Sequence, residues 1–307
     1  MRTLKIYLFG CPQVAYEGEG DGKVRLTRAI QLLLAYLLIN RHRMHSREVL
    51  AGLFWGDYSQ EKARGCLNTA LWRLRRALEP SETPNGTYLV SNTSGEIGFN
   101  PESSYWLDVA IFEELIEKNI NRPINLIDSA NVQEIENALE LYRGDLLEGV
   151  FQDWALQRRE HLRLLYLKAL AFLVQYYNHT EEYDYSLACA QKVLELEPLR
   201  EEVHREVMNL YLILGQRPQA LRQYEICRTL LAAELGIPPM EETQSLYERI
   251  IAEQAQSANG GRDQSASLQQ AIQQLHKATH ALEQAQQQLQ NAMHLLKDLG
   301  VRMDQGE

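Results

Sequence analysis

The spacing of hydrophobic positions changes from alternating to helical early in the chain. Two runs within residues 3–17 alternate apolar and polar side chains, which predicts two short strands. A glycine-rich acidic turn then leads into residues 23–27, which we expect to form a third strand. Apolar residues recur at helical spacing over 29–40 and, after the predicted N-cap Ser46, over 47–55. We therefore expect two helices after a small sheet.

Residues 61–78 have the pattern of a third helix with two unlike faces. Four leucines recur at spacings of four, three and four and predict a buried stripe, namely Leu67, Leu71, Leu74 and Leu78. The segment stops before Pro80, and residues 87–100 resemble a hairpin with turn residues at Asn92–Gly95. A small sheet, three helices and a hairpin in this order predict a winged helix with an additional N-terminal sheet.

The other face of residues 61–78 concentrates cations and amide or hydroxyl side chains. Arginine can pair bidentately with guanine and asparagine with adenine, so such a face suits the major groove of DNA. The candidate DNA contacts are Arg64, Asn68, Thr69, Trp72, Arg73 and Arg76. A solvated amphipathic helix would have a similar pattern. The position as third helix, directly before a hairpin, favours DNA binding.

From about residue 134 the pattern is helical almost without interruption. Ser186 and Ala220 align at an offset of 34 residues, within two segments of similar shape. Small residues at fixed positions in a 34-residue period are typical of tetratricopeptide repeats. We expect flanking helices to complete and cap this two-copy stack at 134–146, 155–178 and 241–254.

The C-terminal part has the most regular pattern in the chain. Residues 255–267 are rich in Gly, Ser and Ala and predict a flexible linker. Beyond it, leucines recur every seven residues from Leu268 to Leu296, with an alanine three residues after each of the first four. This heptad predicts a coiled-coil helix over 268–300 and a homodimer formed through it. A single helix that packs on the protein's own body would use the same stripe.

The charge is divided unevenly between the two halves of the chain. The whole chain has a formal net charge of −10, yet residues 1–110 hold 13 Lys and Arg against 11 Asp and Glu. The remaining residues hold 18 against 30, so the acidic excess lies in the helical part. Four scattered cysteines without a CxxC pair, no signal-peptide pattern and no long apolar run predict a soluble cytoplasmic protein without a membrane span.

No motif for catalysis or for a bound cofactor stands out. The sequence has no glycine-rich phosphate loop, HExxH, GxSxG or EF-hand spacing. His42 and His45 are three residues apart, but two ligands without a third rarely make a metal site. We expect no enzymatic activity, no cofactor and no metal.

Three motifs in fixed order resemble one family. "EVLAGLFWGDYSQEKARGCLNTALWRLRRALEP", "YWLDVAIFEELI" and "ALELYRGDLLEGVFQDWALQRREHLRLLYLKAL" resemble segments of the antibiotic-regulatory-protein (SARP) family, over about residues 2–254. Its members join an OmpR-like winged helix to a bacterial transcriptional activator domain (BTAD). The resemblance implies a mainly α fold with a small β component, and a third helix that enters the major groove of double-stranded DNA. It also implies a wing near Asn92–Gly95 that approaches a minor groove or phosphates. Trp72 replaces a smaller residue of the family pattern and could wedge against DNA, contact a methyl group or pack on the second domain.

The expected organisation has four parts. They are a winged-helix DNA-binding domain at 1–110, a BTAD/TPR-like helical domain at 111–254, the linker at 255–267 and the coiled-coil helix at 268–300. The helical domain would serve regulation, signal transduction and contact with RNA polymerase or another regulator.

Two alternatives to a DNA-binding regulator stay open. In the first, the protein is a receptor for a nucleotide effector such as a cyclic dinucleotide, because arginine forks and aromatic rings suit phosphates and purines. The candidate ligand contacts are Arg25, Arg28, Trp154, Arg158, Arg159 and Arg163, although ion pairs within the chain would explain the same residues. In the second, the repeats and the coiled coil form a protein-interaction adaptor.

Overall fold

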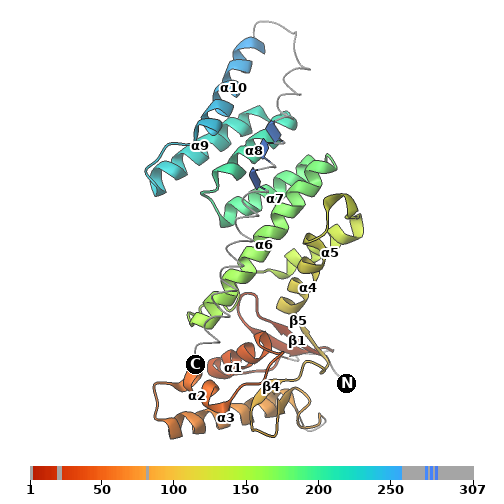
Figure 1. Cartoon of the computed structure of the whole chain (residues 1–307), viewed down its shortest axis with the longest axis vertical. Helices are drawn as coiled ribbons and strands as arrows, with labels where there is room; N and C mark the ends of the chain where they lie inside the picture. Colours follow the sequence, from red (N-terminus) through yellow and green to blue (C-terminus); the bar gives the residue numbers. More distant parts are fainter. Residues whose placement is uncertain are drawn as a thin grey trace. The chain divides into compact units, whose positions relative to one another are not determined.

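The computed structural model describes residues 3–18, 23–80 and 83–257, together with positions 274, 275, 277, 278, 281 and 282 (Figure 1). The chain forms two compact units. The first takes in residues 1–114 and 140–159, and the second takes in residues 115–139 and the chain from 160 onwards. Most described residues are helical and the strands are short, as the mainly α fold class predicts. None of the described helices is long and apolar enough to cross a membrane.

The sheet of the first unit has β1 in its centre. β1 (Leu4–Tyr7) pairs antiparallel with β2 (Gln13–Tyr16) and parallel with β5 (Tyr105–Leu107). The prediction of a third strand at 23–27 was wrong, because that segment makes only a single bridge from Lys23 to Ala15. β5 takes the third place instead. A parallel partner requires a long crossover, which here contains all three helices and the hairpin.

The three helices and the wing occur in the predicted order. They are α1 (Arg28–Ile39), α2 (Arg47–Trp55), α3 (Gln60–Leu78) and the antiparallel hairpin of β3 (Leu89–Ser91) and β4 (Ile97–Phe99). Ser46 is confirmed as the N-cap of α2, since its hydroxyl oxygen accepts the Val49 N–H at 3.2 Å. The leucine stripe of α3 is buried, which anchors this helix on the core of the first unit.

A buried carboxylate joins the sheet to the next helix. Asp108 opens α4 (Asp108–Ile120) and accepts the N–H groups of Leu8, Phe9 and Val109 at 2.8–3.0 Å. Burial raises the pKa of Asp108, and the three N–H donors oppose that rise. The Asp108 carboxylate therefore satisfies N–H groups that directly follow β1.

The segment 140–159 returns to the first unit after a helix of the second. Its backbone exchanges hydrogen bonds with residues 8–10, including Leu147 N–H to the Leu8 oxygen at 2.9 Å. Leu146 and Leu147 are completely buried. The returning segment therefore completes the core of the first unit.

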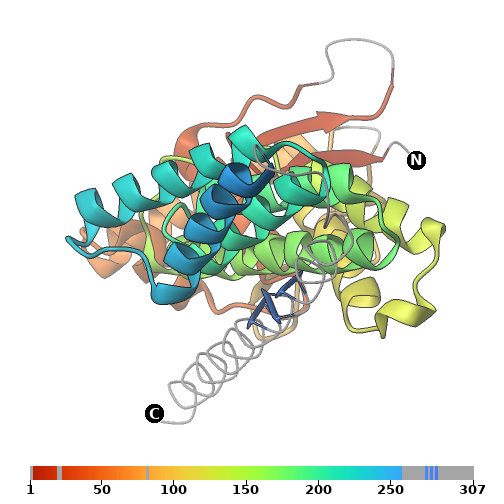
Figure 2. The ribbon, with the colours of Figure 1, turned by 90° about the horizontal axis from the view of Figure 1, so that it is seen from above.

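The second unit is a stack of helices, drawn from yellow to blue in Figure 1. Its elements are the end of α4, a short 3-10 turn η1 (Ile124–Leu126), α5 (Ser129–Leu141), most of α6 (Asp153–His179), α7 (Tyr183–Leu196), α8 (Glu201–Ile213), α9 (Arg217–Glu234) and α10 (Glu241–Ser257). α7 packs on α8, α8 on α9 and α9 on α10, and Figure 2 shows these helices side by side. Ser186 and Ala220 are completely buried, as expected for small residues at repeat contacts.

One polar cluster is buried inside this stack. Glu206 of α8 is completely buried and accepts one hydrogen bond, from the Asn178 side-chain amide at 2.7 Å. Its second carboxylate oxygen has no hydrogen-bond partner among the described residues. Burial raises the pKa of Glu206 from 4.5 to about 7.

The predicted linker at 255–267 and coiled-coil helix at 268–300 lie largely outside the described residues. Among the six described positions of the tail, Leu275 and Leu282 belong to the predicted heptad and are 7% and 3% exposed. Dimerisation through this helix therefore stays a prediction.

Candidate nucleic-acid interface

The exposed face of α3 carries the six predicted DNA contacts. All of them are exposed, namely Arg64, Asn68, Thr69, Trp72, Arg73 and Arg76. At about 100° per residue they cover roughly half of the helix circumference, opposite the buried leucines. One edge of this face lies toward the wing and the other toward α1. The helix thus presents one continuous polar and cationic surface, although the residues that touch DNA stay a prediction.

Arg47 joins α2, α3 and the wing at the first edge. Its Nε–H donates to the Gly95 oxygen in the wing turn at 3.0 Å, and its Nη1 donates to Asn68 Oδ1 at 2.8 Å. Bidentate pairing with adenine uses both the oxygen and the nitrogen of an asparagine amide. Arg47 therefore occupies one of the two lone pairs of Asn68 Oδ1 and fixes the orientation of the amide. No local sequence pattern points to this role of Arg47.

Arg64 is held loosely at the same edge. Its guanidinium lies 3.1 Å from Glu48 of α2, and the two side chains are 52% and 58% exposed. An exposed pair of this kind contributes only about 0–1 kcal/mol, so a phosphate or a guanine can replace the glutamate at low cost.

The end of α3 is tied to the wing by two further contacts. Arg75 donates to the Ser91 hydroxyl of β3 at 3.0 Å. Glu79 is 7% exposed and accepts the N–H groups of Gly86, Tyr88 and Leu89 at 2.8–3.1 Å. These bonds fix the start of β3 against the helix, so the wing has a defined position beside the cationic face.

Trp72 lies in the middle of the face. Its side chain is 58% exposed, and the guanidinium of Arg76 lies 5.4 Å from its ring centroid. An exposed aromatic ring stacked with a cation offers a flat surface for a thymine methyl group or a sugar.

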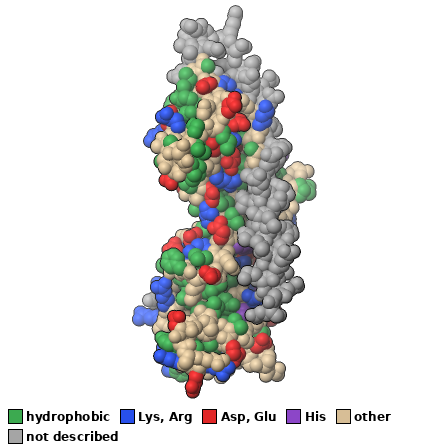
Figure 3. Space-filling view, turned by 60° about the vertical axis from the view of Figure 1, so that its left-hand side comes forward, with side chains coloured by type: hydrophobic (Ala, Val, Ile, Leu, Met, Phe, Trp, Pro, Cys, Tyr) green, Lys and Arg blue, Asp and Glu red, His purple; other side chains and the backbone are tan. Residues whose placement is uncertain are grey.

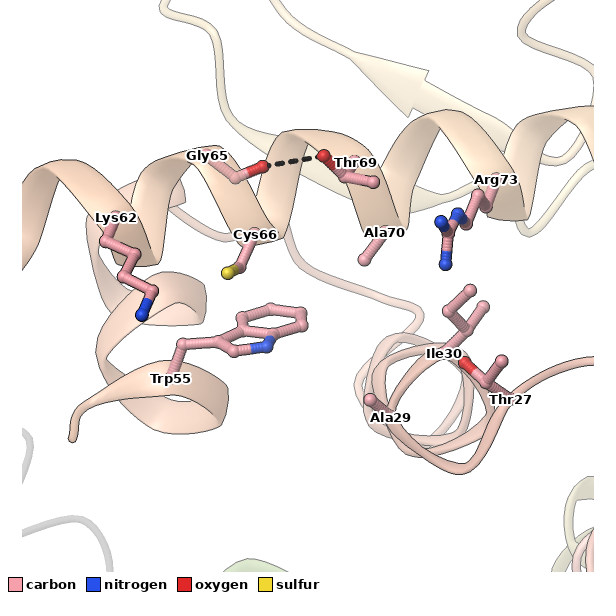
Figure 4. Close-up of a pocket in the computed structure, with 10 residues that line it drawn as sticks. All are labelled: Thr27, Ala29, Ile30, Trp55, Lys62, Gly65, Cys66, Thr69, Ala70 and Arg73. Carbon is pink, nitrogen blue, oxygen red and sulfur yellow. Dashed lines mark hydrogen bonds between the residues drawn. The ribbon is translucent and has the colours of Figure 1, made fainter. Parts of the chain in front are cut away.

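A groove of about 530 Å³ runs along the second edge (Figure 4). α1 contributes Ile30, α2 contributes Trp55, and α3 contributes Thr69 and Arg73 to its lining. The Thr69 hydroxyl donates back to the Gly65 oxygen at 3.0 Å, the dashed line in Figure 4. Lys62 also lines the groove, and no carboxylate does among the described residues. The groove therefore favours an anion.

The candidate ligand contacts have protein partners, with one exception. Arg28 donates to the Gly149 oxygen at 2.7 Å, Arg158 pairs with Glu113 at 2.5 Å, and Trp154 packs on Tyr36 and Phe54. Arg159 donates to three main-chain oxygens, those of Leu146, Leu147 and Val150.

Arg163 belongs to the second unit, where it pairs with Glu160 and Glu197. Arg25 is exposed, and no hydrogen bond or ion pair links it to another described residue. Ion pairs and main-chain contacts within each unit account for these arginines except Arg25, and nothing in the described part of the chain favours a nucleotide receptor.

Figure 3 shows Lys and Arg interspersed with Asp and Glu on the face that it presents, so this face is mixed in charge. Within the described residues, no group of three or more His, Cys, Asp or Glu side chains is placed to hold a metal ion.

Comparison with known proteins finds similarity to a group of transcriptional regulators. The model of the bacterial transcriptional activator domain matches residues 107–251. The regulatory protein AfsR of Streptomyces coelicolor is 29% identical over an alignment of 241 residues, and the match covers 75% of this chain and 23% of AfsR. The chain is therefore similar to SARP-type transcriptional regulators, and its helical part matches their activator domain.

Two further proteins resemble the chain, one in sequence and one in fold. The transcriptional regulatory protein MoaR1 of Mycobacterium tuberculosis is 23% identical, over 71% of this chain and 70% of MoaR1. A solved structure of Mycobacterium tuberculosis EmbR in complex with a low affinity phosphopeptide matches with a TM-score of 0.65 at 20% identity, over 94% of this chain and 72% of that one. That likeness supports the fold. The chain spans less than a quarter of the length of AfsR, so the activity of that longer protein does not transfer as a whole.

Proposed function

We propose that this SARP-type regulator binds specific sites on double-stranded DNA with α3 in the major groove and the β3–β4 hairpin against the flanking backbone or minor groove. The observation that carries the proposal is the construction of α3. One face is sealed into the core by leucines, and the opposite face presents cations and an asparagine beside a wing tied to the same helix.

The two edges of the face suit different parts of the duplex. Arg73 borders the groove without carboxylates, so we assign it to a phosphate. Arg64 and Asn68 lie nearer the wing and we assign them to base edges, where arginine and asparagine discriminate by about 1–3 kcal/mol per good pair. Trp72 and Arg76 lie between them.

The test uses DNA fragments selected by the full-length protein from genomic DNA. We expect Arg64→Ala to weaken binding of the selected site by roughly 10- to 100-fold and to relax preference at one base pair. Arg73→Ala should weaken selected and unselected fragments alike and lower the slope of log affinity against log salt by about 0.9. Arg228→Ala is the matched control, because Arg228 is an exposed, ion-paired arginine on α9 of the second unit.

Equal binding by Arg64→Ala, Arg73→Ala and the unmodified chain would refute the assignment of α3. In that case the protein-interaction adaptor would become the better account of the fold.

The proposal extends to partners. A homodimer would place two α3 helices on half-sites about one turn of DNA apart, or a multiple of it. The helical domain would signal to RNA polymerase or another regulator in the cytoplasm, where chromosomal DNA is accessible. The sign of regulation depends on where the site lies relative to a promoter.

A further inference from the structure

The surface of α8 and α10 borders a cavity of about 470 Å³ in the second unit. The lining combines Arg205 and Asn209 of α8 with Glu241 and Glu242 of α10. The other wall belongs to the C-terminal tail, through positions that include Lys277 and Ala278. Segments more than sixty residues apart in sequence thus face one another across this cavity.

The two leucines among the described tail positions are buried. Leu275 and Leu282 are seven residues apart and occupy equivalent heptad positions, and they are only 7% and 3% exposed. An apolar stripe that needed a second chain to cover it would remain exposed in a single chain. Here one chain covers both leucines. Alanine at 278 and 281 faces the cavity, and such small side chains let helices approach closely.

Charge is complementary across the cavity. Glu241 and Glu242 form the exposed acidic first turn of α10, and Lys277 faces them from the tail. Opposite charges in this arrangement favour one orientation of the tail over its reverse.

One buried polar atom also points to an occupant. Asn209 is 2% exposed and lines the cavity, yet its Oδ1 accepts no hydrogen bond from the described residues. A buried acceptor without a donor is costly, and both Gln274 and Lys277 bring N–H donors to the same cavity. Because a cavity remains between the tail and the α8–α10 surface, the tail makes fewer van der Waals contacts there than a helix of the core would. The tail should therefore be easier to release.

We infer that the α8–α10 surface is a docking site for a helix with a leucine and alanine heptad, and that its occupant is this chain's own segment around 274–282, held in cis. The inference does not depend on DNA binding. The docked tail covers part of the repeat surface, so a partner that uses this part must displace it.

Cross-linking of the full-length chain tests the inference. Ser245 of α10 and Ala278 of the tail both line the cavity. The variant carries Ser245→Cys and Ala278→Cys, with Cys11→Ser and Cys66→Ser to remove the more accessible native thiols. A short bismaleimide should link positions 245 and 278 within a chain of monomer mass. In the matched control, Thr229→Cys on the exposed face of α9 replaces Ser245→Cys and should give little of this product.

A second variant keeps the result interpretable. Leu275→Gln with Leu282→Gln in the same background should lower the yield of the 245–278 link by roughly tenfold or more. Circular dichroism checks that the helices remain. A covalent dimer linked through the same positions would overturn the cis arrangement in favour of a second copy. Absence of any 245–278 link, or a link that is insensitive to the leucine changes, would overturn the docking site itself.

Discussion

Replacement of Glu206 by glutamine should make the helical unit more stable at neutral pH. The carboxyl group is completely buried, and its second oxygen has no partner among the described residues. Glutamine has the shape of the protonated acid and keeps the oxygen that accepts from Asn178. Glu206→Gln therefore removes the cost of ionising a buried group and leaves its hydrogen bond in place.

The size and pH window of the effect follow from the pKa. Burial raises the pKa of Glu206 from 4.5 in its ordinary environment to about 7. Below pH 4.5 the group is protonated in both folded and unfolded chains, so it carries no penalty. As the pH rises from 4.5 to about 7, the unfolded chain ionises first and the folded state loses stability. Above that range the penalty is about 3 kcal/mol.

Urea unfolding of the full-length chain, followed by far-ultraviolet circular dichroism, measures this effect. All four tryptophans lie in the first unit, so their fluorescence reports on that unit separately. We expect Glu206→Gln and the unmodified chain to unfold alike near pH 4.5 and to differ by about 3 kcal/mol near pH 8. Glu248→Gln, an exposed change on α10, controls for the loss of one negative charge. A difference that is the same at both pH values would refute the reasoning.

Three further changes test the first unit. Glu79→Ala leaves the N–H groups of Gly86, Tyr88 and Leu89 without their acceptor, so the free energy of unfolding of the unit should fall by about 1–3 kcal/mol. An unchanged midpoint in melting followed by tryptophan fluorescence would contradict this. Ser46→Ala removes the cap of α2 and should cost about 1 kcal/mol in the same measurement, whereas Ser46→Asp should keep most of it. Trp72→Ala changes an exposed side chain and should alter the free energy of unfolding by no more than about 0.5 kcal/mol, while it weakens binding of the selected DNA. A large drop in stability would show that the ring is structural.

Most helices of the fold could be predicted from the helical spacing of apolar and small residues. The leucine stripe of residues 61–78, the cap at Ser46 and the small residues at Ser186 and Ala220 all occupy the places that spacing and capping rules predict. These features are local, so a single sequence contains the whole signal.

Features that join distant segments could not be predicted in this way. β5 is only three residues long, which is too short for an alternating pattern, and it pairs with β1, which lies about a hundred residues earlier in the chain. Residues 140–159 likewise join the first unit through main-chain hydrogen bonds to residues 8–10, and no pattern of side chains predicts such bonds. Helix α4, which follows β5 directly, was recognised only as a family junction.

For the candidate interface, too, the local part could be predicted and the contacts between elements could not. Composition and spacing placed the cationic face on α3, because helix geometry converts sequence spacing into position around the axis. The partners of that face come from other elements, such as Arg47 of α2 and the wing carbonyl that it binds. Arginines grouped along the chain as ligand candidates have separate partners in the structure, since proximity in sequence does not bring guanidinium groups to one point.

In the proposed binding mode, the arginine that holds both Asn68 and Gly95 would link the contacts of α3 in the major groove to those of the wing. A rotation of the Asn68 amide toward a base would disturb its bond from Arg47, whose Nε–H also holds the Gly95 oxygen of the wing turn. Substitutions in the central and flanking base pairs of an operator should then have non-additive effects on affinity. A binding model that scores each position separately would misrank such sites.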